Sequence, residues 1–261
     1  MHPSQIQDLV EHCEQYRTPN NATAVFQVLT TVPLFVALVA AMYAAVDISY
    51  WITLALSVPT AGLIVRLFII QHDCGHGSFF SSKTANDTTG RLMSILTLTP
   101  YAYWQRAHAL HHATSSNLDR RGFGDIDTLT VEEFRSLPLH KRVWYRIYRN
   151  PLFMTFVGGV LHFLIIQRLP FTVQRPSWRM TASVLLLDLA IVAVYGTLAF
   201  FMGWVHFVLV FAPIVVLSAA AGVWLFYIQH QFEETHWSRD GVWDRKTAAI
   251  LGSSYYELPA I

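Results

Sequence analysis

The sequence predicts an all-α integral membrane protein, with four transmembrane helices in two hairpins and a histidine-rich cap on the cytoplasmic side. The composition points to a membrane, because 53% of the residues are hydrophobic and 13% are charged, whereas about a quarter are charged in soluble domains. Four apolar runs are each long enough to cross a hydrocarbon core about 30 Å thick, which takes about 20 helical residues. Two histidine clusters follow the second of these runs, and a further candidate, His230, follows the fourth.

The predicted spans are residues 24–46, 51–70, 180–203 and 205–228 of a single domain over 1–261. Four residues separate the first two spans, and little more than Trp204 separates the last two. Each pair should therefore be a tight hairpin that returns to the side from which it started. About twenty polar residues precede the first run, which is the wrong order for a cleavable signal peptide, so we expect that run to remain as a span.

The distribution of basic residues predicts the orientation of both hairpins. The hairpin tips contain no Lys or Arg, whereas segment 71–179 contains Lys83, Arg91, Arg106, Arg120, Arg121, Arg135, Lys141, Arg142, Arg146, Arg149, Arg168, Arg175 and Arg179. Basic loops stay on the cytoplasmic side of a membrane, so this segment and both termini should face the cytoplasm. A net charge of +1 gives no sign of a nucleic-acid surface. Two cysteines, Cys13 and Cys74, are too few for a disulfide framework.

Two further apolar stretches, 89–104 and 151–167, are marginal as spans. The first is interrupted by Thr97-Leu-Thr-Pro100 and the second by Gly158-Gly159, so interfacial or buried helices suit them better. Residues 117–150 have the pattern of an exposed loop that leads into a helix. Asp188 lies inside the third span, where an ionisable group is costly, and we expect it to be paired or protonated against a neighbouring helix.

The histidines are the residues from which the sequence predicts a metal site. The first cluster is His72-Asp-Cys-Gly-His76, and if the second span continues past Ile70, both imidazoles lie on one helical face. The second cluster is His108-Ala-Leu-His111-His112, which places three imidazoles within about one turn. His230, after the fourth span, is the third candidate, and the topology brings all three groups to one membrane face. Imidazole suits iron, zinc, copper and nickel, so the pattern predicts a redox metal site near the bilayer.

These motifs resemble the membrane fatty acid desaturase superfamily, in particular its acyl-lipid omega-6 and omega-3 desaturases. The resemblance rests on the HDCGH and HxxHH boxes and also on Arg120-Arg-Gly-Phe-Gly-Asp125, Thr128-Leu-Thr-Val-Glu132, Tyr148-Arg-Asn-Pro151, Gln229-His-Gln-Phe-Glu233 and Gly252-Ser-Ser-Tyr-Tyr-Glu-Leu-Pro259, and it extends from about residue 20 to the end. It implies a centre of two non-haem irons with the ligands His72, His76, His108, His111, His112 and His230, and no catalytic residue beyond these ligands.

The resemblance also implies the reaction, which is the O2-dependent introduction of a cis double bond into the acyl chain of a membrane lipid. Electrons would come from a separate donor of the ferredoxin or cytochrome b5 type, and the basic face over 135–149 is one candidate docking site for it. Four carboxylates are candidates to orient the imidazoles: Asp73, Asp119, Asp125 and Glu233. Of these, Asp73 and Glu233 have the most favourable positions in the sequence. The other histidines, His2, His12, His140, His162, His206 and His236, are expected to be bystanders.

The sequence departs from the family pattern at one point, and two alternative functions stay open. The third HxxHH box of the family would follow Pro259, so we expect the chain to be truncated before that box, with six imidazoles too few to hold two irons firmly. A related oxygenase, such as a hydroxylase or a carotenoid ketolase, would use the same histidines. A metal-poor, non-catalytic fragment that binds lipid is the other alternative.

Overall fold

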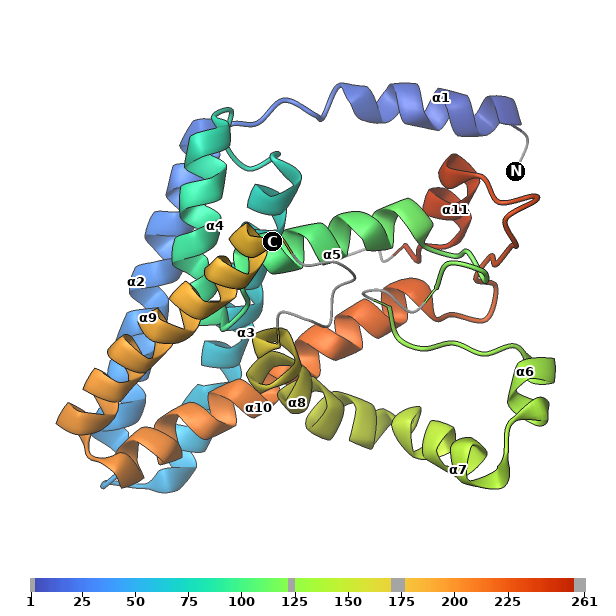
Figure 1. The fold of residues 1–261 in the computed structure, drawn as a ribbon. Helices are drawn as coiled ribbons and strands as arrows, with labels where there is room; N and C mark the ends of the chain where they lie inside the picture. Colours follow the sequence, from blue (N-terminus) through green and yellow to red (C-terminus); the bar gives the residue numbers. More distant parts are fainter. Residues whose placement is uncertain (1–2, 122–124, 170–176, 256–261) are drawn as a thin grey trace. The chain divides into compact units, whose positions relative to one another are not determined.

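The computed structural model of the chain describes residues 3–121, 125–169 and 177–255, and these residues are mostly helical (Figure 1). The helices are α1 (Pro3–Glu14), α2 (Asn21–Ala45), α3 (Tyr50–His76), α4 (Lys83–Thr97), α5 (Tyr101–Thr114), α6 (Val131–Ser136), α7 (Leu139–Tyr148), η1 (Phe153–Gly158), α8 (Gly159–Leu164), η2 (Ile166–Arg168), α9 (Trp178–Met202), α10 (Trp204–His230) and α11 (Arg245–Leu251). Within those ranges there is no β-strand, only an isolated bridge between Asn117 and Ser238. The prediction of an all-α protein is confirmed.

The chain forms two compact units. The first unit comprises the described parts of Met1–Arg17, Arg106–Asn150 and Val223–Ile261, and the second comprises those of Thr18–Gln105 and Pro151–Gly222. Helices α5 and α10 each contribute residues to both units.

Four helices are long and apolar enough to cross a membrane, namely α2, α3, α9 and α10. They match the four predicted spans, although α3 and α10 continue past the predicted ends to His76 and His230. Leu139–Tyr148 and Phe153–Arg168 pass the same criteria only when taken together. On α9, Leu185, Leu189 and Val192 are exposed at intervals of four and three residues, as expected of a helix face that contacts lipid.

In the second unit, α2 and α3 lie side by side and are joined by a short turn (Figure 1). The side chain of Asn20 accepts hydrogen bonds from the amides of Ala22 and Thr23, which caps the start of α2. The Thr53 hydroxyl of α3 donates to the Met42 carbonyl of α2 across 3.2 Å. Both residues are fully buried, so this bond lies in the apolar contact between the two helices.

Helix α4 ends at Thr97, because Leu98 adopts a left-handed conformation with φ of 55°. The predicted interruption at 97–100 is therefore confirmed. The Gln71 side chain, fully buried near the end of α3, donates to the Thr99 carbonyl across 3.0 Å and accepts from the Thr97 hydroxyl. This buried amide connects the end of α3 to the break that follows α4.

Asp188 is paired, as predicted, and its partner is Arg168 of η2, with Nη1 and Oδ1 3.0 Å apart. The same guanidinium donates to the carbonyls of Leu98 and Phe163. A single cation thus neutralises the carboxylate within α9 and also satisfies a carbonyl at the end of α4.

In the first unit, α6 begins with a capping box between Thr130 and Glu133. The Thr130 amide and the Arg121 guanidinium hold the pKa of the Glu133 carboxyl below its usual range. The Leu118 amide donates to the Ser238 carbonyl and the Trp243 indole donates to the Ser115 carbonyl. These bonds tie the segment after α5 to the residues that follow α10.

Candidate metal centre

Three pairs of imidazoles face each other through their Nε2 atoms, and each pair lies within one unit. The distance is 3.2 Å between His72 and His76, 3.0 Å between His108 and His112, and 3.2 Å between His111 and His230. Two nitrogen ligands that each lie about 2.1 Å from one metal ion are about 3.0–3.4 Å apart at bond angles of about 90–110°. All three distances fit neighbouring ligands of a single ion.

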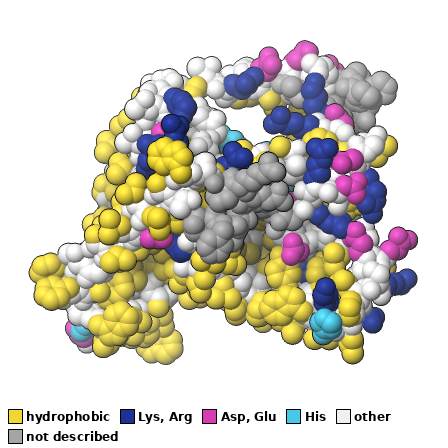
Figure 2. Space-filling model, in the orientation of Figure 1, with side chains coloured by type: hydrophobic (Ala, Val, Ile, Leu, Met, Phe, Trp, Pro, Cys, Tyr) yellow, Lys and Arg dark blue, Asp and Glu magenta, His cyan; other side chains and the backbone are white. Residues whose placement is uncertain are grey.

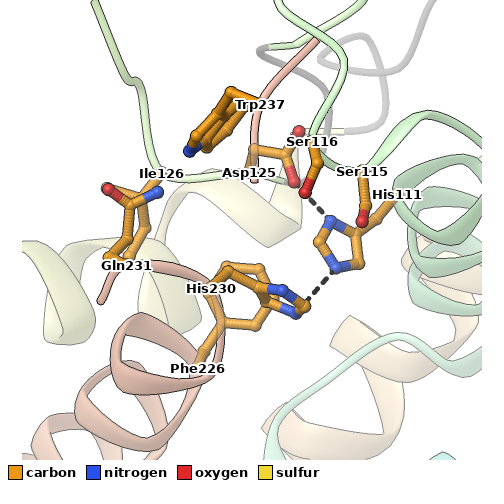
Figure 3. A pocket seen from close by; sticks show the side chains of 9 residues that line it. All are labelled: His111, Ser115, Ser116, Asp125, Ile126, Phe226, His230, Gln231 and Trp237. Atoms are coloured by element: carbon orange, nitrogen blue, oxygen red, sulfur yellow. Dashed lines mark hydrogen bonds and ion pairs between the residues drawn. The ribbon is translucent and has the colours of Figure 1, made fainter. Parts of the chain in front are cut away.

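His111 and His230 form the most enclosed of these pairs (Figure 3). His111 is 2% exposed, and the ring of Phe226 packs against both imidazoles at centroid distances of 5.2 and 5.4 Å. The Nδ1 of His111 contacts a carboxylate oxygen of Asp125, and the Nδ1 of His230 lies 3.0 Å from the Gly252 carbonyl. A pocket beside the pair is lined also by Ser115, Ser116, Ile126, Gln231 and Trp237.

The partners of the Nδ1 atoms determine where the protons of this pair lie. A carboxylate or carbonyl oxygen only accepts hydrogen bonds, so each Nδ1 must carry the proton of its neutral ring. The Nε2 atoms of His111 and His230 then present lone pairs to each other across 3.2 Å. Two facing lone pairs repel unless a cation lies between them. An imidazole whose Nδ1–H donates to a carboxylate or carbonyl is also the usual state of a metal-ligating histidine.

His72 and His76 lie on the last turn of α3, so the predicted continuation of the second span past Ile70 is confirmed. The Nδ1 of His72 lies 2.9 Å from Oδ1 of Asp73, which directs the Nε2 lone pair of His72 toward His76. Gly77 ends the helix in a left-handed conformation with φ of 71°, which glycine adopts without steric cost.

The carbonyls at this end of α3 are bound by side chains from the first turns of α5. The Tyr101 hydroxyl donates to the Cys74 carbonyl and the Gln105 amide donates to the Gly75 carbonyl, both across 2.9 Å. Burial raises the pKa of the Tyr101 hydroxyl, so it stays protonated as a donor. These bonds satisfy carbonyls that the end of a helix leaves without intrahelical partners, and they fix the direction of the His72–His76 turn.

Gly75 has a steric reason to be glycine. A Cβ at this position would lie 2.8 Å from Cζ3 of Trp104, which is closer than van der Waals contact allows. The Trp104 ring lies 5.6 Å from His72 and 5.3 Å from Phe68 between ring centroids. The glycine of the first box therefore lets the indole pack against the turn that carries His72.

His108 and His112 are four residues apart on α5, with ring centroids 4.4 Å apart. In the same unit, the His111 ring lies 5.9 Å from that of His108 and 5.4 Å from that of His112. The HxxHH spacing therefore brings the three imidazoles of the second box together, and the fold adds His230 to them.

Two of the four predicted carboxylates contact an imidazole, namely Asp73 and Asp125. Asp119 instead accepts from the Asp240 amide and the Arg239 guanidinium, which hold the pKa of its carboxyl below the usual range. Glu233 is exposed and, within the described parts of the chain, makes no hydrogen bond to a histidine. Its ranking beside Asp73 was therefore wrong, and Asp125 takes that place.

Of the histidines predicted to be bystanders, His2 lies outside the described residues. His206 contacts Asp47 across 2.9 Å, and His162 packs edge-on against Phe163. His12 contacts the exposed Gln15, and His140 is exposed. The backbone amide of His236 donates to the Leu251 carbonyl. None of these contacts, as described, joins a bystander to the paired imidazoles.

The sequence analysis did not find the residues that bind or pack against the end of α3, where the His72–His76 pair lies. Gln71, Tyr101, Trp104 and Gln105 carry no motif of their own, and only the proximity of Gln71 to the first box would have suggested it.

The fold and the site together define an all-helical protein with four helices suited to a membrane and with paired imidazoles suited to a transition metal. The family model described as "Fatty acid desaturase" matches residues 48–257. The chain belongs to this family of oxidoreductases of lipid metabolism.

Individual relatives agree with that family. A "Fatty acid desaturase" of Bacillus subtilis (strain 168) is 42% identical over 253 residues, which are 97% of this chain and 71% of the relative. Two proteins of Synechocystis sp. share shorter regions. An "sn-1 acyl-lipid omega-3 desaturase (ferredoxin)" is 47% identical over 22% of this chain and 16% of its own length. An "sn-1 oleoyl-lipid 12-desaturase" is 27% identical over 54% of this chain and 38% of its own length.

Proposed function

We propose that this chain provides most of the metal site of an enzyme that catalyses the O2-dependent desaturation of a fatty acyl chain carried on a membrane lipid. The observation that carries the proposal is the His111–His230 pair, whose Nδ1 protons are directed away and whose Nε2 lone pairs face each other across 3.2 Å. The relatives named for acyl-lipid desaturation support the choice of substrate.

The cofactor that we propose is a pair of non-haem irons, since an imidazole-rich donor set suits iron. The proposed ligands are His72, His76, His108, His111, His112 and His230. When bound, iron would supply the activation of O2 and the removal of hydrogen from an unactivated methylene, which no side chain can perform. The protein would hold each Nε2 lone pair in place through the Nδ1 partners, of which Asp73, Asp125 and the Gly252 carbonyl are visible.

The remaining parts of the proposal concern topology and electron supply. We propose that α2 with α3 and α9 with α10 form two transmembrane hairpins. The termini and all six ligands would then lie on the cytoplasmic side, as the basic residues of segment 71–179 favour. The electron donor would be an external ferredoxin or a protein of the cytochrome b5 type. One relative is named for ferredoxin, which supports the first choice.

Product analysis tests the proposal. The chain is expressed in bacterial cells together with a ferredoxin and its reductase, and the acyl chains of intact membrane lipids are analysed by gas chromatography with mass spectrometry. Iron in the purified protein is measured by plasma mass spectrometry. For this chain alone the expected result is substoichiometric iron and no product. For a version extended by a third HxxHH box, the expected result is bound iron and a new cis double bond in lipid-bound acyl chains. A hydroxylated or ketone product from the extended version would instead identify a related oxygenase, and an extended version without iron or product would contradict the proposal.

A further inference from the structure

Helix α7 in the first unit has two chemically different sides. On one side the Tyr145 hydroxyl accepts from the Leu129 amide and the Tyr148 hydroxyl accepts from the Asp127 amide, both across 3.1 Å. Just after the helix, Arg149 donates to Gln231 and lies over the Tyr227 ring. This side therefore attaches the helix to the rest of its unit.

The other side of α7 is apolar and exposed. Leu139, Val143 and Ile147 are 70%, 47% and 43% exposed. They recur every four residues, so at about 100° per residue they form a stripe along one face. Trp144, 59% exposed, extends the stripe on one side. Large apolar side chains in such a row mark an interaction surface rather than ordinary protein surface.

Cations border this stripe. When the helix is drawn at about 100° per residue, Arg146, which is exposed and lies over the Phe134 ring, is about 20° beyond Leu139. Lys141, also exposed, is about 60° beyond Trp144, between the directions of Tyr148 and Tyr145, so it reaches the stripe only through its long side chain. Arg135 precedes the helix, and no acidic residue occurs between Arg135 and Arg149. Figure 2 shows hydrophobic side chains gathered over α7 with Lys, Arg and His side chains among them. An apolar stripe with cationic borders complements the acyl boundary and anionic phosphates of a bilayer surface.

We propose that α7 lies in the membrane interface, with the Leu139–Val143–Ile147 stripe inserted among the acyl chains and its cations on anionic lipid headgroups. The chain contains four helices that are long and apolar enough to cross a bilayer, and α7 is followed after a short link by the apolar stretch Phe153–Arg168. An acidic electron donor would match the cations but would leave the three aliphatic side chains without suitable partners, so the bilayer is the favoured occupant. The inference does not depend on the proposed reaction.

Depth-dependent quenching tests the proposal on the whole chain in lipid nanodiscs. In a Cys13→Ser background, Val143→Cys is labelled with the environment-sensitive fluorophore NBD, while Cys74 is buried. Phospholipid brominated near the top of the acyl chains is the quencher. Glu132→Cys on the neighbouring helix α6 is the matched solvent control, and Leu189→Cys on α9 is the bilayer control. The background protein without an added cysteine must remain unlabelled.

The expected result is that the probe at 143 emits at shorter wavelength than the probe at 132 and loses most of its emission in brominated lipid, as the probe at 189 does. Quenching at 143 should be stronger in nanodiscs with anionic lipid than in purely zwitterionic ones. The double variant Lys141→Glu/Arg146→Glu should remove that difference. The proposal is overturned if the probe at 143 behaves like the probe at 132 in both lipids while the probe at 189 is quenched. Protection of the probe at 143 from aqueous iodide by added ferredoxin would then assign this face to the electron donor.

Discussion

The Nε2 atoms of His111 and His230 lie 3.2 Å apart, although 119 positions separate the two residues in the chain. Their Nδ1 atoms are held by Asp125 and by the Gly252 carbonyl. Both rings thus offer a lone pair to the same point, and a cation at that point would relieve the repulsion between them.

We expect His111→Ala and His230→Ala to lose iron while the protein stays in the membrane, because each removes one donor from the pair and leaves the apolar helices unchanged. His76→Ala should act in the same way. The loss of iron affinity should exceed the roughly 10–100-fold that follows removal of an outer partner. Iron content of protein purified in one detergent is the measurement. His162→Ala is the control, and equal damage from that variant would show that the ligands have not been separated from the bystanders.

Asp125→Asn should weaken iron binding by about 10–100-fold, because an amide of the same size cannot hold the Nδ1 proton of His111 as a carboxylate does. The matched control is Asp127→Asn. The Asp127 side chain is exposed, and its contact with Tyr148 is made by the Asp127 backbone amide, which the substitution leaves unchanged. Iron affinity is measured by competition with a chelator. An unchanged affinity in Asp125→Asn would leave Asp125 with a packing role only.

Gly75→Ala should destabilise the protein by about 1–3 kcal/mol, the usual cost of overpacking a tight contact, because its Cβ would press on Trp104. Gly62→Ala on the same helix has nothing within 4 Å of the added carbon and should be neutral or slightly stabilising. Thermal unfolding in detergent compares the two. If the contact with Trp104 is the cause, Trp104→Phe should partly restore the stability of Gly75→Ala.

Removing either member of the Arg168–Asp188 pair should cost about 1 kcal/mol, the lower end of the range for a buried polar group left unsatisfied, because both side chains are half-buried. Arg168→Leu should be the more damaging single change, since this side chain also donates to the Leu98 and Phe163 carbonyls. The double variant Arg168→Leu/Asp188→Leu should cost less than the sum of the single variants, because an apolar pair leaves no unpaired charge. Strictly additive losses in thermal unfolding would show that the two groups are not coupled.

The proposed orientation predicts the pattern of thiol labelling in intact cells. A membrane-impermeant reagent applied from outside should not modify Cys13, which would lie in the cytoplasm. The same reagent should modify a cysteine introduced as Ser49→Cys between the first two spans. Protection of that cysteine together with labelling of Cys13 would reverse the orientation.

The sequence by itself determined the class of the fold and most of the candidate ligands. Apolar runs of about 20 residues allow little other than membrane helices, because backbone polar groups in lipid must be satisfied within the segment. The boxes His72–His76 and His108–His112 were also predictable, because both depend on residues three or four apart on one helix. Local periodicity is enough in each case.

The tertiary structure decided what supports those histidines. The contact of Asp125 with His111, the two side chains of α5 that bind the carbonyls of Cys74 and Gly75, and the Arg168–Asp188 pair all join residues from different elements. No helical period connects such positions, since their proximity arises only when the chain folds back on itself. Sequence proximity also fails as a guide to these contacts: Glu233, three positions from His230, is exposed, whereas Asp125, 14 positions from His111, contacts the His111 ring.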